Sequence, residues 1–322
     1  MTGIDLVTDP LLIERFERDL AALAPAPGKI GVAVSGGPDS LALLLLAAAA
    51  RPGAVEAATV DHGLRQSSAA EASMVAGLCK TLGVPHHILT VHWPSPPTAN
   101  LQARARAVRY EELTGWALAR RLPLVATAHH ADDQAETLLM RLARGAGLSG
   151  LVATRARREL DDGIELIRPL LGWRKQELSE IVAAAGLTAV DDPANRDPRH
   201  DRARMRAVLR DAEWADPMRL AATATWLAEA DAALDWALAG LRKERIERAG
   251  AALWLDPQGV PAELLRRLLL AAFAELGAPL PRGPELARAM ASLAAGRTAT
   301  LSGLKLESGE RWRLSAAPPR RG

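Results

Sequence analysis

Short apolar runs alternate with longer amphipathic stretches over the first two hundred or so residues of the chain. The apolar runs predict strands at 29–34, 54–60, 86–91, 123–128 and 164–167. The stretches between them have the spacing of helices, at 39–50, 69–82, 100–121 and 132–144. This alternation predicts an α/β fold, a doubly wound parallel sheet with helices on both faces. Ligands of such sheets bind outside the carboxyl ends of the strands, so candidate chemistry is sought there.

The pattern changes in the last third of the chain. Residues 191–202 are rich in Pro, Asp and Arg and predict a linker or a surface loop. Residues 203–293 carry alanine- and leucine-rich amphipathic stretches typical of helices, and residues 297–315 alternate as in a β-hairpin that turns near Ser308 and Gly309. We therefore expect a larger α/β domain at 1–206 and a smaller, mostly helical domain at 207–322 with a small β-hairpin.

Composition limits the class of protein. Hydrophobic residues make up 49% of the 322 residues, which is enough to bury a core. With a single cysteine, Cys79, the chain cannot form a disulfide framework or a CxxC site by itself. The first residues lack a basic-then-apolar signal pattern, and the longest apolar run, residues 41–50, is too short to cross a membrane. We expect a soluble, cytoplasmic protein with no membrane contact.

The positive charge comes mainly from arginine, in a chain of net charge +2 and pI about 9.0. Two explanations stay open: a codon bias towards arginine, and phosphate binding by forked guanidinium groups. Local groups of arginines distinguish between these two explanations better than the net charge does. The chain has three such groups: Arg104, Arg106 and Arg109; Arg196, Arg199, Arg202, Arg204, Arg206 and Arg210; and Arg141, Arg144, Arg155, Arg157 and Arg158. We expect phosphate contacts from the second group, whereas the third fits a solvated surface equally well.

A serine- and glycine-rich segment follows the first predicted strand and opens the next helix, with the residues Ser35, Gly36, Gly37, Pro38, Asp39 and Ser40. The glycines allow a tight turn, and the helix N-terminus offers free N–H groups and a positive dipole end. Asp39 is a candidate ligand for Mg²⁺. The segment is an anion-binding loop suited to pyrophosphate, without the lysine of a GxxxxGK[ST] loop. An ordinary strand-to-helix turn capped by serines is the weaker alternative.

Further polar residues stand at strand ends and on a helix. Asp61 and His62 end the second predicted strand, and His129 follows the fourth. Either histidine could contact a nucleotide, take up a proton, or only make structural hydrogen bonds. Asp133 and Glu136 lie three apart on a predicted helix, so their carboxylates share one face. They could bind a cationic substrate, or merely interact favourably with the helix dipole.

The Ser35–Ser40 segment resembles the SGGxDS loop of the N-type ATP pyrophosphatases, which cleave ATP between the α and β phosphates and form adenylylated intermediates. Later segments narrow the resemblance, and they lie in order at 60–65, 102–110, 128–137, 144–151, 168–171, 192–195 and 201–206. This ordered set, over residues 28–206, resembles the tRNA(Ile)-lysidine synthase family. One departure is Ala203, where the family usually has asparagine after the arginine.

The resemblance implies an adenine nucleotide alpha hydrolase-like fold and a reaction. ATP, L-lysine and the first-anticodon-position cytidine of an isoleucine tRNA with a CAU anticodon give lysidine, AMP and pyrophosphate. The implied cofactors are ATP and Mg²⁺, and the implied partners are this tRNA and L-lysine. The chain resembles the shorter members of the family, so residues 207–322 are expected to contact the tRNA. Dimers are common in the superfamily, so a homodimer stays open.

The resemblance also implies site residues. The nucleotide is expected at the Ser35–Ser40 loop with Asp61 and His62. The expected catalytic residues are Asp39, His129 and Arg106, and Asp39 is the expected metal ligand. The residues expected to bind substrates are Asp133, Glu136, Arg109, Arg202 and Arg206.

Three alternatives fit the residues less well. A tRNA thiolase of the same superfamily usually needs cysteine pairs or an iron–sulfur cluster, and Cys79 stands alone. A synthetase that uses ammonia would need a glutaminase, for which the sequence has no nucleophile elbow or N-terminal cysteine. A catalytically silent RNA-binding module would not need the intact Ser35–Ser40 loop or the acidic pair.

Overall fold

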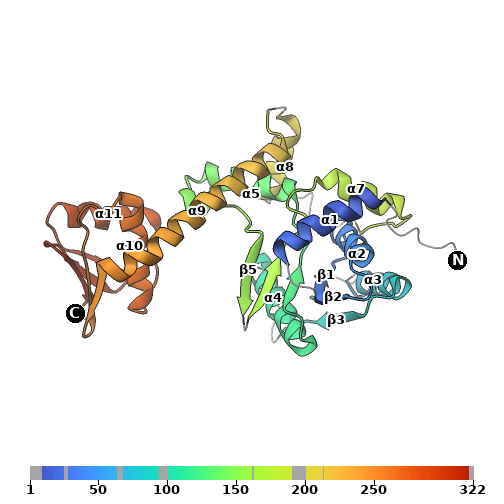
Figure 1. The fold of residues 1–322 in the computed structure, drawn as a ribbon, viewed down its shortest axis with the longest axis horizontal. Helices are drawn as coiled ribbons and strands as arrows, with labels where there is room; N and C mark the ends of the chain where they lie inside the picture. Colours follow the sequence, from blue (N-terminus) through green and yellow to red (C-terminus); the bar gives the residue numbers. More distant parts are fainter. Residues whose placement is uncertain are drawn as a thin grey trace. The chain divides into compact units, whose positions relative to one another are not determined.

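The computed structural model describes residues 9–24, 28–63, 68–93, 101–161, 163–190, 201–212 and 214–318 (Figure 1). The chain divides into two compact units, Met1–Ala228 and Glu229–Gly322, which are described separately. The sequence suggested a division after residue 206. The first unit extends further because helix α8 (Asp201–Asp211) packs against α5 (Ala131–Ala143), and because Ala224, near the start of α9 (Pro217–Arg245), joins a buried cluster with Leu138.

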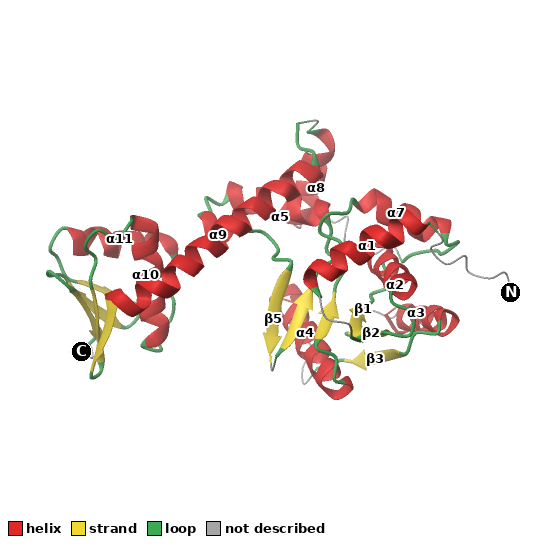
Figure 2. Cartoon of the chain, viewed as in Figure 1, coloured by secondary structure: helices red, strands yellow, loops and turns green. Residues whose placement is uncertain are grey.

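In the described part of the first unit, six strands form one sheet in the order β3-β2-β1-β4-β6-β5 (Figure 2). They are β1 (Ile30–Ala33), β2 (Val55–Asp61), β3 (His86–Thr90), β4 (Leu124–Ala126), β5 (Arg157–Asp161) and β6 (Ile164–Ile167). Neighbouring strands are parallel except β5, which runs antiparallel to β6. The predicted parallel, doubly wound sheet is confirmed. The strand order reverses between β1 and β4, and this switch point is where such sheets bind ligands.

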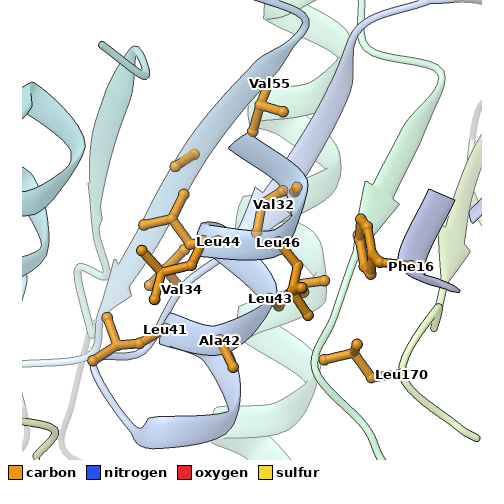
Figure 3. Close-up of a cluster of buried hydrophobic side chains, with 14 of the residues drawn as sticks. Phe16, Val32, Val34, Leu41, Ala42, Leu43, Leu44, Leu46, Val55 and Leu170 are labelled. Atoms are coloured by element: carbon orange, nitrogen blue, oxygen red, sulfur yellow. The ribbon is translucent and has the colours of Figure 1, made fainter. Parts of the chain in front are cut away.

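Helices pack against this sheet and against one another. Besides α5 and α8, the helices of the first unit are α1 (Pro10–Leu23), α2 (Pro38–Ala50), α3 (Ser68–Leu82), α4 (Leu101–Arg120), α6 (Leu148–Leu151) and α7 (Lys175–Ala184). The middle of α2 is buried all round because the helix contacts the sheet as well as α1 and α7. Figure 3 shows Leu43 of α2 on the side that faces Phe16 and Leu170, with Leu44 on the other side.

Side chains alternate between the two faces of the sheet along each strand. On β4, Val125 packs with residues of α4, whereas Ala126 belongs to the cluster that surrounds α2. Gly31 of β1 lies against α4, and a Cβ atom there would stand 2.7 Å from the ring of Trp116. The missing side chain therefore allows α4 to approach β1 closely.

Strand β5 was absent from the sequence prediction. Its five residues, Arg157–Asp161, are mostly charged and exposed, with Leu160 as the apolar exception. They show no alternation of apolar and polar positions, which is the signal for a half-buried strand. The strand forms because its backbone pairs with β6, and its charges suit an exposed sheet edge. Its place in the sheet brings Arg158 near α4.

The described part of the second unit has a five-stranded antiparallel sheet in the order β7-β8-β11-β10-β9. Its strands are β7 (Ile246–Ala249), β8 (Ala252–Leu255), β9 (Ala299–Leu301), β10 (Leu304–Glu307) and β11 (Trp312–Ala316), and its helices include α10 (Ala262–Glu275) and α11 (Gly283–Ala294). The predicted hairpin is the β10–β11 pair, with its turn near Ser308 and Gly309. The second unit has more than a small hairpin, because β7 and β8 lie within residues 203–293, which were expected to be helical.

Composition led to expectations about membrane-spanning segments and about the single cysteine. No described helix combines enough length with enough apolar character to cross a membrane. Cys79 is buried in α3, and burial raises the pKa of its thiol to about 12. Because a thiolate is the reactive form of cysteine, Cys79 is a packing residue and no candidate nucleophile.

Candidate active site

The Ser35–Ser40 loop connects β1 to α2 and is held by its own hydrogen bonds. Ser40 Oγ accepts a hydrogen bond from the Ser35 N–H at 3.1 Å and donates one to the Gly37 carbonyl at 3.0 Å. The Ser35 hydroxyl is therefore the donor in its 3.2 Å contact with Ser40 Oγ. Gly36 has a φ of +82°, which glycine adopts without strain. The loop is a preformed turn that leaves the first N–H groups of α2 available to a ligand.

Asp39, in the first turn of α2, approaches His130, the residue that precedes α5. Asp39 Oδ2 lies 3.5 Å from His130 Nε2, and Asp39 Oδ1 is buried with no hydrogen-bond partner among the described residues. Asp132 Oδ2 lies 3.5 Å from His130 Nδ1, and Asp133 Oδ2 lies 3.6 Å from His130 Nε2. Because β1 and β4 are neighbours, the turns that follow these two strands meet at the switch point.

His130 is almost fully buried, with 2% of its surface exposed. Burial alone would lower its pKa, but hydrogen bonds to Asp132 and Asp39 and the charge of Asp133 outweigh burial and raise the pKa of His130 to about 10. A protonated ring cannot accept the 3.4 Å contact from the Asp133 N–H at Nδ1. Three carboxylates around the ring favour the proton over that long contact, so we assign the charged form.

From the sequence we expected a role for His129 and none for His130. The signal for His130 was its position directly before a predicted helix whose first turn carries two aspartates. A residue at this position lies at the helix N-terminus, within reach of both carboxylates. What the sequence could not show was that Asp39, 91 positions earlier, completes the cluster.

His129 lies in the wall of the neighbouring pocket. Its Nδ1 is 3.0 Å from Thr127 Oγ1. Burial, and then the positive charges of Arg168 and Arg106, lower the pKa of His129 to about 3 despite the opposing charge of Asp133. The ring is therefore neutral near pH 7, which suits it to hydrogen bonding and makes it a weak base.

A pocket of about 200 Å³ lies outside the carboxyl ends of β1, β2 and β4. The residues along its wall are Ala33, Val34, Ser35, Gly37, Asp39, Ser40, Ala58, Val60, Arg109, Tyr110, Leu113, Thr127, Ala128, His129 and Asp133. It combines small apolar residues of the strands with the donors at the start of α2. This combination fits a nucleotide, with the base against the apolar residues and the phosphates on the loop. Gly36 and Pro38 shape the loop backbone without lining the pocket.

Asp61 and His62 are not in the pocket wall. Asp61 accepts a hydrogen bond from the Gly63 N–H at 2.9 Å, and its pKa is lowered, first by a hydrogen bond with Ser68. The His62 ring lies 6.3 Å from the Trp93 ring, whose Nε1 donates to the His62 carbonyl at 2.7 Å. Both residues organise the turn after β2, and their expected contact with the nucleotide stays a prediction.

Asp133 and Glu136 differ in exposure although both lie on α5. Asp133 lines the pocket, whereas Glu136 is 2% exposed and its Oε1 accepts a hydrogen bond from Arg206 Nε. Arg206 Nη2 also lies 3.9 Å from Asp133 Oδ1. Burial raises the pKa of Glu136 against the pull of Arg206. The cation beside this acidic pair is therefore a guanidinium of the chain itself, in the place where a substrate cation was expected.

The three arginine groups separate in the structure according to their partners. Most arginines of the third group are occupied within the chain: Arg141 donates to the Gly150 and Ala153 carbonyls, Arg144 pairs with Asp201, and Arg157 pairs with Glu165. In the second group, Arg204 pairs with Asp201 and Arg206 with Glu136, while Arg202 is exposed on α8. Arg196, Arg199 and the 192–195 segment lie outside the described residues.

Tyr110 of α4 gathers arginines from three elements. The guanidinium carbons of Arg106 and Arg158 lie 5.1 and 4.7 Å from the centre of its ring. Arg168, which follows β6, is only 3% exposed and is hydrogen-bonded to the Tyr110 side chain. Arg109 lines the pocket together with Tyr110. From the sequence we expected roles for Arg106 and Arg109, left phosphate contact open for Arg158, and named no role for Tyr110 or Arg168. The sequence pattern could not show that these residues meet.

Asp39 is the residue expected to hold Mg²⁺. The described residues contain no group of three or more His, Cys, Asp and Glu side chains arranged as a metal site. Mg²⁺ is, however, commonly held by one or two carboxylates together with substrate phosphates and water. Asp39 offers a carboxylate oxygen, Oδ1, that no described residue contacts by a hydrogen bond, beside a pocket suited to phosphates. It fits an ion that binds together with a nucleotide.

Comparison with known proteins identifies the family. Residues 12–213 match the family model of the PP-loop domain. The chain is 48% identical over 311 residues to the tRNA(Ile)-lysidine synthase of Novosphingobium aromaticivorans, in an alignment that covers 95% of this chain and 94% of that protein. It belongs to the tRNA(Ile)-lysidine synthase family. A second member, from Zymomonas mobilis, is 43% identical over 92% of this chain and 91% of its own length. As a lysidine synthase family member with a PP-loop domain, the chain is an ATP-using, tRNA-modifying ligase.

Solved structures confirm the predicted fold. The U34-tRNA thiolase NcsA from Methanococcus maripaludis, solved with its [4Fe-4S] cluster, aligns with a TM-score of 0.55 over 68% of this chain and 79% of that chain. At 17% identity the similarity concerns the fold alone. This lysidine synthase family member has Cys79 as its single cysteine, so the thiolase alternative lacks the residues that would hold such a cluster within one chain.

Proposed function

We propose that this chain joins the ε-amino group of L-lysine to C2 of the cytidine at the first anticodon position of an isoleucine tRNA with a CAU anticodon. ATP is converted to AMP and pyrophosphate, and the modified tRNA reads AUA in place of AUG. One observation carries the proposal. In a chain of this family, the Ser35–Ser40 loop, Asp39 and Asp133 border one pocket at the switch point of the sheet.

In the first step, cytidine O2 attacks the α-phosphorus of ATP, the bond from that phosphorus to the bridging oxygen breaks, and pyrophosphate leaves. The first N–H groups of α2 would donate hydrogen bonds to the departing phosphates, while the hydrogen bonds of Ser35 and Ser40 hold the loop in shape. His130 holds Asp39 through Oδ2, while Oδ1 has no hydrogen-bond partner among the described residues. Mg²⁺ held by Asp39 would supply positive charge at the pyrophosphate.

In the second step, the neutral ε-amine of lysine attacks C2, the C2–O bond breaks, and AMP leaves. The free ammonium has a pKa of about 10.4, so it must first lose a proton. Transfer to His129, whose pKa burial lowers to about 3, would be strongly uphill. We therefore give His129 a hydrogen-bonding role and assign the proton to a substrate phosphate.

The lysine ammonium is proposed to bind at Asp133, which lines the pocket. Glu136 is covered and paired with Arg206, so it would contact lysine only after that guanidinium moved away. Replacing Asp133 with Asn should raise the lysine concentration needed for half-maximal rate about tenfold or more, with less change for ATP, because the substitution removes a charge-assisted hydrogen bond. An equal effect on the lysine and ATP requirements would contradict this assignment.

The partners and location follow from the substrates. Arg109 and Arg202 are proposed to contact tRNA phosphate, and residues 207–322 to contribute further tRNA contacts. Because tRNA, ATP and free lysine occur together in the cytoplasm, we propose that the reaction takes place there. Light scattering of the purified chain, with and without tRNA, would test the homodimer that the superfamily suggests.

The proposal is tested by incubating the purified chain with ATP, Mg²⁺, L-lysine and unmodified isoleucine tRNA, followed by nucleoside mass spectrometry. A cytidine that gains the mass of lysine minus water, only with all components present, is the expected result. Asp39→Asn should abolish pyrophosphate release, whereas Glu14→Gln, at an exposed carboxylate on α1, should not. Release of pyrophosphate with another RNA, and no modified cytidine, would keep the ATP chemistry and reject the lysidine assignment.

A further inference from the structure

Four arginines surround Tyr110 beside the pocket, and we call this group the Tyr110 collar: Arg106, Arg109, Arg158, Arg168 and Tyr110 itself. Arg106 and Arg109 lie on α4, Arg158 lies on β5, and Arg168 is the residue that follows β6. Arg106 and Arg158 lie over the Tyr110 ring, and Arg168 is hydrogen-bonded to the tyrosine side chain. Two arginines that are 52 positions apart in the sequence thus share one ring.

The charges of the collar have no carboxylate partners in the described part of the chain. No Asp or Glu side chain there lies within ion-pair distance of any of its four arginines. Arg157, the neighbour of Arg158 on the same strand, pairs with Glu165. Arg168 is 3% exposed, and its Nε is buried without a hydrogen-bond partner among the described residues. Gathering like charges costs folding free energy unless an anion relieves the repulsion, so the collar has the chemistry of an anion site.

The Tyr110 collar and the loop that would hold the ATP phosphates belong to different secondary-structure elements. That loop belongs to β1 and α2, whereas the collar belongs to α4, β5 and the end of β6. Arg106, Arg109 and Arg158 are exposed, so a macromolecule can reach them. Arg109 and Tyr110 also line the pocket, so an anion bound at the collar would lie next to the reacting groups.

We infer that the Tyr110 collar binds a backbone phosphate of the RNA substrate beside the nucleotide that enters the pocket. The inference rests on the proposed function and adds to it the group that holds the RNA chain at the pocket. Guanidinium forks bind phosphate oxygens in pairs, and phosphate contacts fix the register of a nucleic acid without reading its sequence. Tyr110 orients the guanidinium groups of Arg106 and Arg158 through its ring.

The test compares the RNA affinity of the full-length wild type with that of Arg158→Gln, Arg158→Lys and Arg106→Gln over a range of KCl concentrations. The control is Arg157→Gln, next to Arg158 on β5 and engaged in an exposed ion pair. Unmodified isoleucine tRNA is the probe, bound in the absence of ATP and lysine. Affinity for ATP with Mg²⁺ is measured on the same proteins. Circular dichroism confirms that each variant is folded.

Arg158→Gln and Arg106→Gln should each weaken tRNA binding about tenfold at low salt, and the slope of log affinity against log salt should fall by about 0.7 for each phosphate that is no longer neutralised. Arg158→Lys should keep most of the slope but bind tRNA more weakly, because it keeps the charge and lacks the fork. Arg157→Gln and wild type should agree, and ATP affinity should not change.

Equal tRNA affinities and slopes for wild type and the collar variants would overturn the inference. Weaker ATP binding with unchanged tRNA affinity would overturn it too, because the anion would then be the ATP polyphosphate. The proposed function fails in a different way, by the absence of lysidine from reactions of the wild-type chain, whatever the binding slopes show.

Discussion

Replacing His130 with asparagine removes a buried cation from among Asp39, Asp132 and Asp133 and places a residue type that caps helices well at the start of α5. The pKa of His130 is about 10 in the folded chain, against an ordinary value of 6.5. A group whose pKa rises on folding stabilises the folded state fully below its unfolded pKa, and this contribution is lost as pH rises through the folded pKa. From these two values the contribution is about 4 kcal/mol at pH 7 and about 1.4 kcal/mol at pH 9.

The advantage of wild type over His130→Asn should therefore shrink by about 2.5 kcal/mol between pH 7 and pH 9, which is a Tm difference of about 5 to 10 °C for a unit of this size. Calorimetry of both proteins in matched buffers measures it. His129→Asn is the matched control, because the His129 ring, with a pKa of about 3, is neutral throughout this pH range and its Tm gap should stay constant. A constant gap for His130→Asn would refute the charged assignment.

Two other changes test packing and charge. Gly31→Ala should lower the free energy of unfolding by about 1 to 3 kcal/mol, because its Cβ would stand 2.7 Å from the Trp116 ring. Urea denaturation measures this change. The control is Gly28→Ala, whose Cβ would have no atom within 4 Å and which should be neutral. Arg206→Gln should cost about 3 to 5 kcal/mol by leaving the buried Glu136 carboxylate without its cation. Adding Glu136→Gln to that variant should restore part of the stability, and no restoration would contradict the ion-pair explanation.

Hydrophobic periodicity predicted most strands and helices of the first unit. The predicted strands and helices of residues 29–144 each correspond to an element of the structure, and the Ser35–Ser40 loop lies at the end of β1 as expected. These features are local, since a strand, a turn and a helix N-terminus each depend on a few consecutive residues. Strands β5 and β7 escaped prediction because they are exposed edge strands, stabilised by pairing with a neighbour and lacking an alternating pattern. Strand β8 was missed as well, because its short apolar run lies among residues whose pattern is helical.

The candidate site depended on contacts that no local pattern contains. Sequence alone named Asp39, His129, Asp133 and Glu136 as chemistry-bearing residues. Tertiary structure decided that His130 is the histidine beside Asp39, and that Arg206 is the partner of Glu136.

The same distinction holds for the arginines. Their number and order could be read from the sequence, but whether each is paired could not. Arg157 and Arg158 are adjacent, yet the first pairs with Glu165 and the second lies over the ring of Tyr110. The sequence thus determined the parallel sheet, the anion-binding loop and the family resemblance. Only the tertiary structure decided which charges meet, because strand order and helix packing bring together side chains far apart along the chain, and burial then sets their pKa values and partners.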